Sequence, residues 1–256
     1  MNSRERLTAA SRGGPVDHPP WFAWSPSASL QAVRSFAQRW APDAVVAANA
    51  DDARALLAEL GEDGPAVLAE TSNPFALASE AGADLDAAFG RSPAEGEERL
   101  IPFVHTVGER IERAMEAGVD GVLYCLRGAN PAESTPMSYS GFYLEHDRDL
   151  LEQAAAARFN VLFVEGGVGV YLDFVHDLPA SALAWDEEAS GVTPRDLRKL
   201  HSGALACGLS GDHAALWEES DGIGLIFAGR VPDLASFDFS PVKDASMKLG
   251  SAVAHE

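Results

Sequence analysis

The chain has 256 residues, 46% of them hydrophobic, and its 39 acidic and 19 basic residues give a formal net charge of −20 at pH 7. So acidic a surface excludes nucleic acid and anionic lipid as expected partners, because both are bound through positive charge. No apolar stretch follows the charged start MNSRERL, and no window reaches the ~18 apolar residues of a membrane helix, so a cytoplasmic protein is expected. Cys125 and Cys207 both lie in apolar runs and are expected to be buried free thiols.

Eight short apolar runs recur along the chain and are predicted to be β-strands. Each run is continuously apolar rather than alternating, which is typical of parallel strands that are covered on both faces. In chain order the runs are Trp21–Trp24, Ala44–Ala48, Ala66–Ala69, Gly121–Cys125, Asn160–Val164, Ser181–Trp185, Ala204–Gly208 and Gly224–Phe227.

Amphipathic segments alternate with these runs and are predicted to be helices. Two acids open one of them and Thr193-Pro194 opens another, and both patterns favour a helix N-terminus. The predicted helices are Ser29–Trp40, Asp51–Leu60, Ile101–Ala117, Tyr139–Ala157 and Arg195–His201. The segment GRSPAEGEERL, between the third and fourth strands, is predicted to be an exposed loop before a helix.

The alternation of eight strands with helices predicts the fold class. Such units over about 250 residues fit an α/β fold with a single (β/α)8 barrel of the TIM type, and an open doubly wound sheet is the alternative. No internal repeat or linker divides the chain, so residues 1–256 are expected to form one domain. In such a barrel, functional residues collect at the C-terminal ends of the strands.

A glycine-rich turn follows the fifth strand, in the sequence FVEGGVGVYLD. Turns of this kind can cradle phosphate, but here Leu172 stands where the dinucleotide fingerprint has its third glycine. The carboxylate of Glu165 before the turn would also repel a pyrophosphate. Nucleotide binding is therefore not expected at this turn. The sequence also has no zinc-type cysteine spacing, HExxH motif, Walker loop or GxSxG elbow.

Acidic and arginine side chains collect at the predicted strand ends. Carboxylates there can move protons, and arginines can hold a substrate carboxylate through two hydrogen bonds. The predicted catalytic residues are Glu165, Asp51 and Asp186, and the predicted substrate-binding residues are Arg127, Arg230, Tyr124, Asn49 and Trp24. Capping of the helix that follows is an alternative role for Asp51. Glu165, in contrast, directly ends an apolar strand with no helix close behind it.

Several stretches, in family order, resemble the uroporphyrinogen decarboxylase superfamily. The opening SRERLTAASRGGPVDHPP is similar to the helix and turn that lead into the first strand of that family. The other similar stretches are SNPFALASEAG, AGVDGVLYCLRGA, YLEHDRDLLEQAAAARFNVLFVEG, HDLPASALAWDEE and ALACGLSG. Together they span nearly the whole chain. The resemblance implies a (β/α)8 barrel with one of two chemistries: cofactor-free decarboxylation of tetrapyrrole acetate groups, or zinc-dependent methyl transfer among thiols, cobamides and related carriers.

The chain departs from the motifs of both chemistries. Family decarboxylases carry an arginine-rich segment after the first strand, where this chain has AWSPSASL, and Ala50 stands in place of their catalytic aspartate, one residue before Asp51. Family methyltransferases hold zinc with His-x-Cys after the fifth strand and a Cys after the eighth. The matching positions here are Phe163, Glu165, and Gly229 or Arg230. Since zinc favours thiolate and imidazole ligands, no metal or other cofactor is expected.

Two hypotheses from different classes follow. The first is a divergent, metal-free enzyme, a decarboxylase-type lyase that acts on a small carboxylated substrate. In it, Arg127 and Arg230 hold a carboxylate, and one of the predicted catalytic acids moves a proton. The second is a catalytically silent barrel that binds a ligand or a partner protein. Zinc- or cobamide-dependent methyl transfer is a third, less favoured hypothesis. The expected partner is a small molecule, and a homodimer is an open option.

Overall fold

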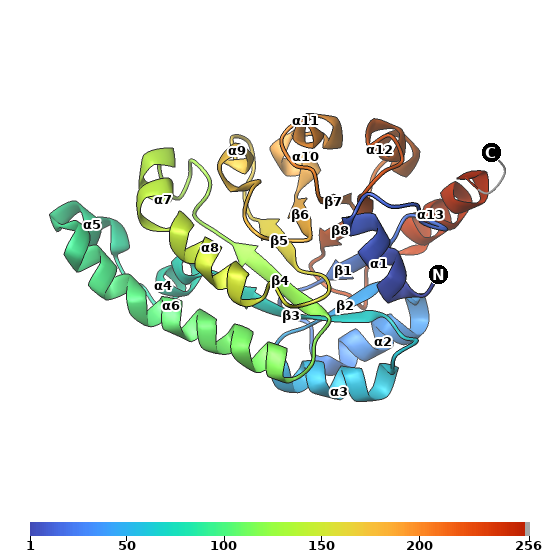
Figure 1. The fold of residues 1–256 in the computed structure, drawn as a ribbon, viewed down its shortest axis with the longest axis horizontal. Coiled ribbons are helices and arrows are strands. Elements are labelled where there is room, and N and C mark those ends of the chain that lie inside the picture. Colours follow the sequence, from blue (N-terminus) through green and yellow to red (C-terminus); the bar gives the residue numbers. More distant parts are fainter. Residues whose placement is uncertain (254–256) are drawn as a thin grey trace.

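Eight parallel strands form one closed barrel, with helices on its outer side (Figure 1). The structure is a computed structural model that describes residues 1–253. The strands are β1 (Trp21–Trp24), β2 (Ala44–Ala47), β3 (Ala66–Ser72), β4 (Gly121–Leu126), β5 (Val161–Val164), β6 (Ala182–Trp185), β7 (Ala204–Gly208) and β8 (Leu225–Arg230). The ring closes where β8 pairs with β1, in a register that places Trp24 beside Arg230. The eight predicted strands and the predicted (β/α)8 barrel are confirmed.

Helices connect the strands and complete the outer layer. They are α1 (Ser3–Ser11), α2 (Leu30–Trp40), α3 (Ala50–Leu60), α4 (Pro74–Glu80), α5 (Leu85–Arg91), α6 (Pro93–Glu116), α7 (Pro136–Phe142), α8 (Leu144–Gln153), α9 (Leu172–Val175), α10 (Glu187–Ser190), α11 (Pro194–Arg198), α12 (His213–Glu219) and α13 (Ser240–Val253). The helix predicted over 139–157 is divided at Tyr143, where α7 ends and α8 begins.

The prediction of a loop over GRSPAEGEERL is wrong, because most of this segment is helical. Helix α5 runs to Arg91, and α6 begins at Pro93. The hydroxyl of Ser92 accepts a hydrogen bond from the backbone N–H of Glu95 at 3.2 Å and so caps α6. Proline at the first helical position needs no N–H partner, so Ser-Pro here starts a helix rather than a turn.

The barrel interior combines three large aromatic rings with many small side chains. Phe22, Trp24 and Phe163 point inward, and the rings of Trp24 and Phe163 meet edge to face with centroids 5.0 Å apart. Most of the other inward positions on β2, β3, β6, β7 and β8 are alanines: Ala44, Ala66, Ala182, Ala184, Ala204, Ala206 and Ala228. The rings fill the space that the alanines leave, so the barrel is a packed core rather than a channel.

Helix α1 covers the N-terminal end of the barrel. Leu7 and Ala10 of this helix belong to the same buried cluster as the inward-facing strand residues. Arg4 pairs with Asp120 at 2.8 Å, and Arg6 pairs with Asp43, each acid lying just before a strand. The two acids also accept backbone N–H groups, from Val67 and Trp21 respectively. The N-terminal end is therefore closed by α1 and its two buried arginines, which leaves the opposite end for a ligand.

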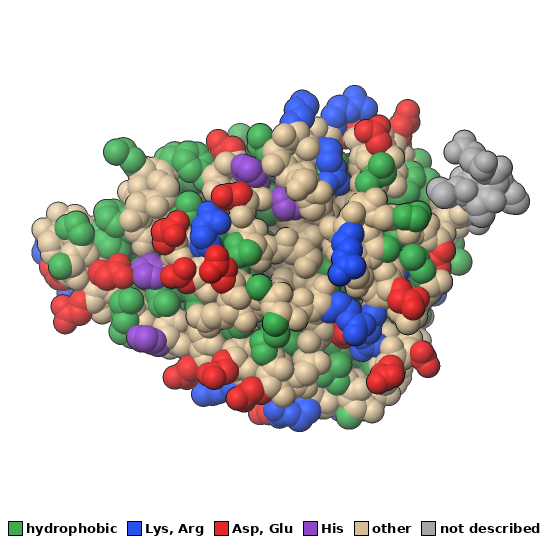
Figure 2. Space-filling model, viewed as in Figure 1, with side chains coloured by type: hydrophobic (Ala, Val, Ile, Leu, Met, Phe, Trp, Pro, Cys, Tyr) green, Lys and Arg blue, Asp and Glu red, His purple; other side chains and the backbone are tan. Residues whose placement is uncertain are grey.

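Charged side chains cover the outside of the molecule. Figure 2 shows acidic groups on the left, lower and right parts of this face, with basic groups among them. Over residues 1–253, every helix is too short or too polar to cross a membrane. Cys125 and Cys207 are both buried and unpaired, as predicted.

Candidate functional site

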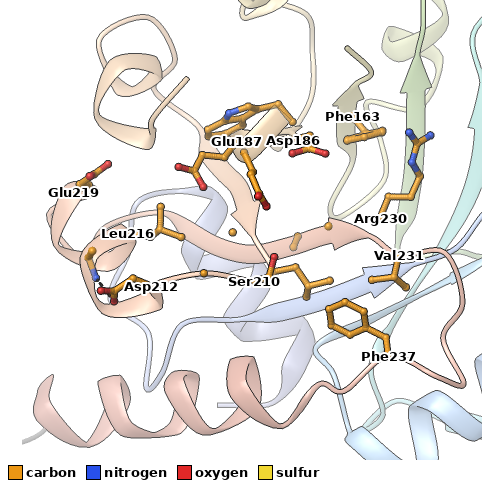
Figure 3. Close-up of a pocket in the computed structure, with 18 residues that line it drawn as sticks. Phe163, Asp186, Glu187, Ser210, Asp212, Leu216, Glu219, Arg230, Val231 and Phe237 are labelled. Atoms are coloured by element: carbon orange, nitrogen blue, oxygen red, sulfur yellow. Dashed lines mark hydrogen bonds between the residues drawn. The ribbon is translucent and has the colours of Figure 1, made fainter. Parts of the chain in front are cut away.

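A cavity of about 460 Å³ lies at the C-terminal mouth of the barrel, beside the ends of β6, β7 and β8 (Figure 3). Its walls are formed by residues 185–188, 208–212 and 228–231, with side chains of α12, Phe163 and Phe237 completing them. This volume lies within the range of small-molecule sites, roughly 300–1,000 Å³. The cavity occupies the end of the fold where (β/α)8 enzymes carry their active sites.

Opposite charges lie at different parts of this cavity. Figure 3 shows Arg230 and Phe163 at one end, Asp212 and Glu219 at the other, and Glu187 between them. Burial and the neighbouring carboxylates, Glu219 first among them, raise the pKa of Glu187. The cavity can therefore offer one cation and several carboxylates to a bound molecule.

Arg230 and Glu165 form an ion pair at the edge of the cavity. An Nη of Arg230, at the end of β8, lies 2.8 Å from Oε1 of Glu165, which directly follows β5. The guanidinium also lies over the ring of Phe163, 5.3 Å from its centroid. Both side chains are about one third exposed, at 38% and 30%, so an incoming ligand can reach the pair. The structure thus brings together two predicted site residues that lie 65 positions apart.

Next to this pair, Glu70 forms a second acidic position that was not among the predicted site residues. It lies on β3, two residues after the inward-facing Leu68, and accepts a hydrogen bond from the thiol of Cys125 with 3.7 Å between sulfur and oxygen. Burial raises the pKa of the Glu70 carboxyl and Glu165 adds to the increase, while the Cys125 hydrogen bond and Arg230 oppose it. Glu70 does not line the cavity itself but lies beside Arg230, within reach of its charge.

Cys125 supports Glu70 as a neutral hydrogen-bond donor. Its side chain is 7% exposed, and burial together with Glu70 and Glu165 raises the pKa of the thiol well above its usual value. A thiol that keeps its proton is a poor nucleophile and a poor metal ligand. Its role at the mouth is therefore to hold the carboxyl of Glu70 in place.

Arg127 is engaged by the chain's own loop. Its Nε donates to Oε1 of Glu133 at 3.1 Å, while the other oxygen of Glu133 accepts from the backbone N–H of Gly128 and from the amide of Asn130. These bonds organise the loop between β4 and α7. The side chain does not line the cavity, so the structure does not place Arg127 beside Arg230 as predicted.

Asn49 and Asp51 lie at the start of α3, away from the cavity. The Asn49 side chain caps the helix by accepting the backbone N–H of Asp52 at 2.9 Å. The Asp51 side chain is 92% exposed and pairs with Arg54 of the same helix. Asp186 does line the cavity, but its carboxylate already accepts the backbone N–H of Ala189 and so caps α10. Helix capping accounts for Asn49 and Asp186, and a surface ion pair accounts for Asp51.

Tyr124 points away from the barrel interior, into the layer between β4 and the helices. Its hydroxyl donates to Asp147 Oδ1 of α8 at 2.6 Å, and the hydroxyl of Tyr139 donates to Oδ2 at 2.5 Å. Asp147 is 1% exposed, and burial raises its pKa to about 6. This network joins α7 and α8 to the barrel. Trp24 points inward but is 1% exposed, so it packs against the ring of Phe163 and does not face a ligand.

The residues at the positions that match the zinc ligands of the methyltransferases do not fit a zinc ion. Phe163 and Gly229 carry no ligand atom in their side chains, and Arg230 is a cation that is paired with Glu165. Within residues 1–253, no three His, Cys, Asp or Glu side chains are arranged to hold a metal ion. Zinc needs thiolate, imidazole or carboxylate donors in a tetrahedral set. The side chains at this site therefore do not fit zinc-dependent chemistry.

Comparisons with known proteins support the architecture. The chain matches no protein-family model and no curated protein. Among solved structures it is similar to a methyltransferase from Methanosarcina mazei, with a TM-score of 0.80, 13% identity and coverage of 99% of each chain. It is also similar to a protein from Burkholderia cenocepacia J2315 described as a lyase/mutase, with a TM-score of 0.49, 15% identity, and coverage of 99% of this chain and 84% of that one. The first likeness shows that this (β/α)8 barrel is shared, over its whole length, with the Methanosarcina methyltransferase.

Proposed function

We propose that the chain is a metal-free lyase of the decarboxylase type that acts on a small carboxylated substrate at the mouth of the barrel. The observation that carries this proposal is the group formed by Glu70, Arg230 and Glu165 beside the 460 Å³ cavity. It combines a carboxyl group whose pKa is raised by burial with an accessible arginine. These are the two groups that binding a carboxylate and protonating a carbon atom require.

Arg230 is the proposed substrate-binding residue. In the free protein its charge is balanced by Glu165, and the pair is exposed enough for a ligand to compete. A substrate carboxylate would take the place of Glu165 on the guanidinium. Phe163 beneath the guanidinium keeps Arg230 directed across the mouth through a cation–π contact.

Glu70 is the proposed proton donor. When the carbon–carboxylate bond of the substrate breaks, CO2 leaves and its bonding electrons stay on the carbon, where an electron-accepting group of the substrate stabilises them. The carboxyl of Glu70 then transfers its proton to that carbon and becomes a carboxylate, which solvent protonates again. Burial favours the protonated acid before each turnover, since it raises the pKa of Glu70.

The substrate is proposed to be small rather than a tetrapyrrole with many carboxylates. Such a molecule needs several converging cations, and Arg230 is the one arginine or lysine among the residues that line the cavity. An acidic protein of net charge −20 also offers no long-range attraction to a polyanion. Methyl transfer, the activity in the name of the Methanosarcina protein, is less well supported because zinc does not fit this site.

A catalytically silent, ligand-binding barrel is the second candidate. One observation favours it: Arg230 and Arg127 are each already neutralised by a carboxylate of the chain. A protein of this kind would bind carboxylates at Arg230 without releasing CO2.

The test is to measure CO2 release from a panel of small carboxylates that carry an electron-accepting group next to the carboxylate. Glu70→Gln is expected to lower kcat by at least about 100-fold with little change in KM, since general acids contribute 10²–10⁴-fold. Arg230→Met is expected to raise KM. The control is Glu188→Gln, an exposed acid on the cavity rim. Full turnover by the Glu70 variant would exclude the proton-donor role, and binding without any CO2 release would favour the silent barrel.

A further inference from the structure

Apart from Arg230, the charged residues that line the cavity are all carboxylates. The five are Asp186, Glu187, Glu188, Asp212 and Glu219. Within residues 1–253, none of the five takes part in an ion pair. Asp186 and Asp212 have structural roles as the caps of α10 and α12. Glu188 is exposed to solvent, so Glu187 and Glu219 remain to be explained.

Glu187 and Glu219 are both partly buried and line the same cavity. Glu187 is the first residue of α10 and Glu219 the last of α12, so two separate elements bring them to one wall. Among the neighbouring charges, that of Glu219 contributes most to the raised pKa of Glu187. One oxygen of Glu219, Oε2, is shielded from solvent and has no hydrogen-bond donor in the described structure. Since Oε2 is closed to solvent, a bound donor would meet the other oxygen of Glu219, which accepts no hydrogen bond within residues 1–253.

We infer that the substrate is zwitterionic, with a carboxylate that binds Arg230 and an ammonium group that binds between Glu187 and Glu219. This inference rests on the proposed function, because it assigns the substrate class of the same cavity. An ammonium group brings one positive charge and three N–H donors, which suit two carboxylates that have neither a cation nor a full set of donors. Its position opposite Arg230 would align the charges of an amino-acid-like molecule along the cavity (Figure 3).

The cavity's shape and charge favour an organic cation over a metal ion. No three potential metal ligands are suitably arranged within residues 1–253, and the two caps already use Asp186 and Asp212. Apolar side chains such as Leu216 and Phe237 line the same space, where they can contact the carbon chain between the two charged groups. A hydrated divalent ion would gain nothing from those contacts.

The experiment compares chain-matched probes by calorimetry on the full chain. One series is the ω-amino acids from β-alanine to 6-aminohexanoate, and the other is the unsubstituted monocarboxylates of the same lengths. At one length at least, the amino acid is expected to bind tenfold or more tightly than its partner. Glu187→Gln and Glu219→Gln should each remove most of that advantage without changing the affinity for the monocarboxylate. Glu188→Gln should change neither, and Arg230→Met should weaken both series.

The outcomes separate this inference from the proposed function. If monocarboxylates bind through Arg230 but the ammonium group adds no affinity at any length, the zwitterionic substrate is wrong and the lyase proposal stands. If neither series binds the unmodified protein, both fail. Magnesium or calcium binding that Glu187→Gln abolishes would make the wall a metal site and overturn the inference. An ammonium advantage that survives both glutamine variants would overturn it as well.

Discussion

The buried Asp147 leads to a prediction about how the free energy of unfolding of this barrel varies with pH. The carboxyl is fully enclosed between β4, α7 and α8, where it accepts hydrogen bonds from Tyr124, Tyr139 and Asn73 and, within residues 1–253, forms no ion pair with an arginine or lysine. Burial is the dominant effect and raises its pKa from 3.8 to about 6. The folded protein therefore binds this proton more tightly than the unfolded chain does. This stabilises the folded protein at pH values below the pKa of Asp147 in the unfolded chain. The stabilisation is lost as the pH rises through the pKa of Asp147 in the folded protein.

The size of the effect follows from the difference between the two pKa values. A shift of about two units corresponds to roughly 3 kcal/mol, at about 1.4 kcal/mol per unit. About 2 kcal/mol of that loss should develop between pH 4.5 and 7.5, because the unfolded carboxyl is already largely ionised at the lower value. Asp147→Asn removes the titration while keeping a side chain of the same shape that can bond both tyrosines.

Urea unfolding of both proteins at a series of pH values checks this prediction. The free energy of unfolding of the wild type, minus that of the Asn variant, should fall by about 2 kcal/mol between pH 4.5 and 7.5. Asp149→Asn, at an exposed acid on the same helix, is the control and should leave the pH dependence unchanged. A difference that stays flat or rises over this range would refute the reasoning.

Three further predictions concern other parts of the molecule. Arg6→Met should destabilise the fold by about 3–5 kcal/mol in urea unfolding, because Asp43 is left buried without its cation; a loss below 1 kcal/mol would contradict this. Gly96→Ala should cost about 1–3 kcal/mol, since the new Cβ would lie 2.1 Å from a buried ring, whereas Gly90→Ala, with open space around it, should be neutral or slightly stabilising. The kcat of the proposed reaction should fall as pH rises through the raised pKa of Glu70, and a flat profile up to pH 9 would exclude Glu70 as the acid.

The strands could be predicted because their apolar runs are short and continuous. The same property concealed which side chains point inward. In GVLYCL every residue is buried, so nothing in the sequence distinguishes the inward face of β4 from the outward one. Tyr124 was therefore expected at the site, whereas Cys125 is the residue that points inward and meets Glu70.

Part of the site could be predicted, but its pairings could not. Glu165 and Arg230 each follow an apolar run, so their place at the mouth could be read from the sequence. That they meet depends on the curvature of the barrel, which brings β5 and β8 to face each other across the mouth. Glu70 also follows an apolar run, AVLA, but the strand continues to Ser72 through pairing with β4, and the contacts of Glu70 with Cys125 and Arg230 could not be read from the sequence. Glu133, the partner of Arg127, lies only six residues further along the chain, but whether the two side chains meet depends on how the β4–α7 loop folds.

The closure of the barrel's N-terminal end by α1 has a consequence for how the protein is made. This helix is synthesised first, but the acids that its arginines require lie at positions 43 and 120, before β2 and β4. On the ribosome, α1 cannot form these ion pairs until nearly half of the chain has emerged, and β8 can pair with β1 and close the barrel only after nearly all of the chain has been made. Leu7 and Ala10 therefore lack part of their native neighbours until the later strands have been made, and in this interval they are open to a chaperone that binds short apolar segments.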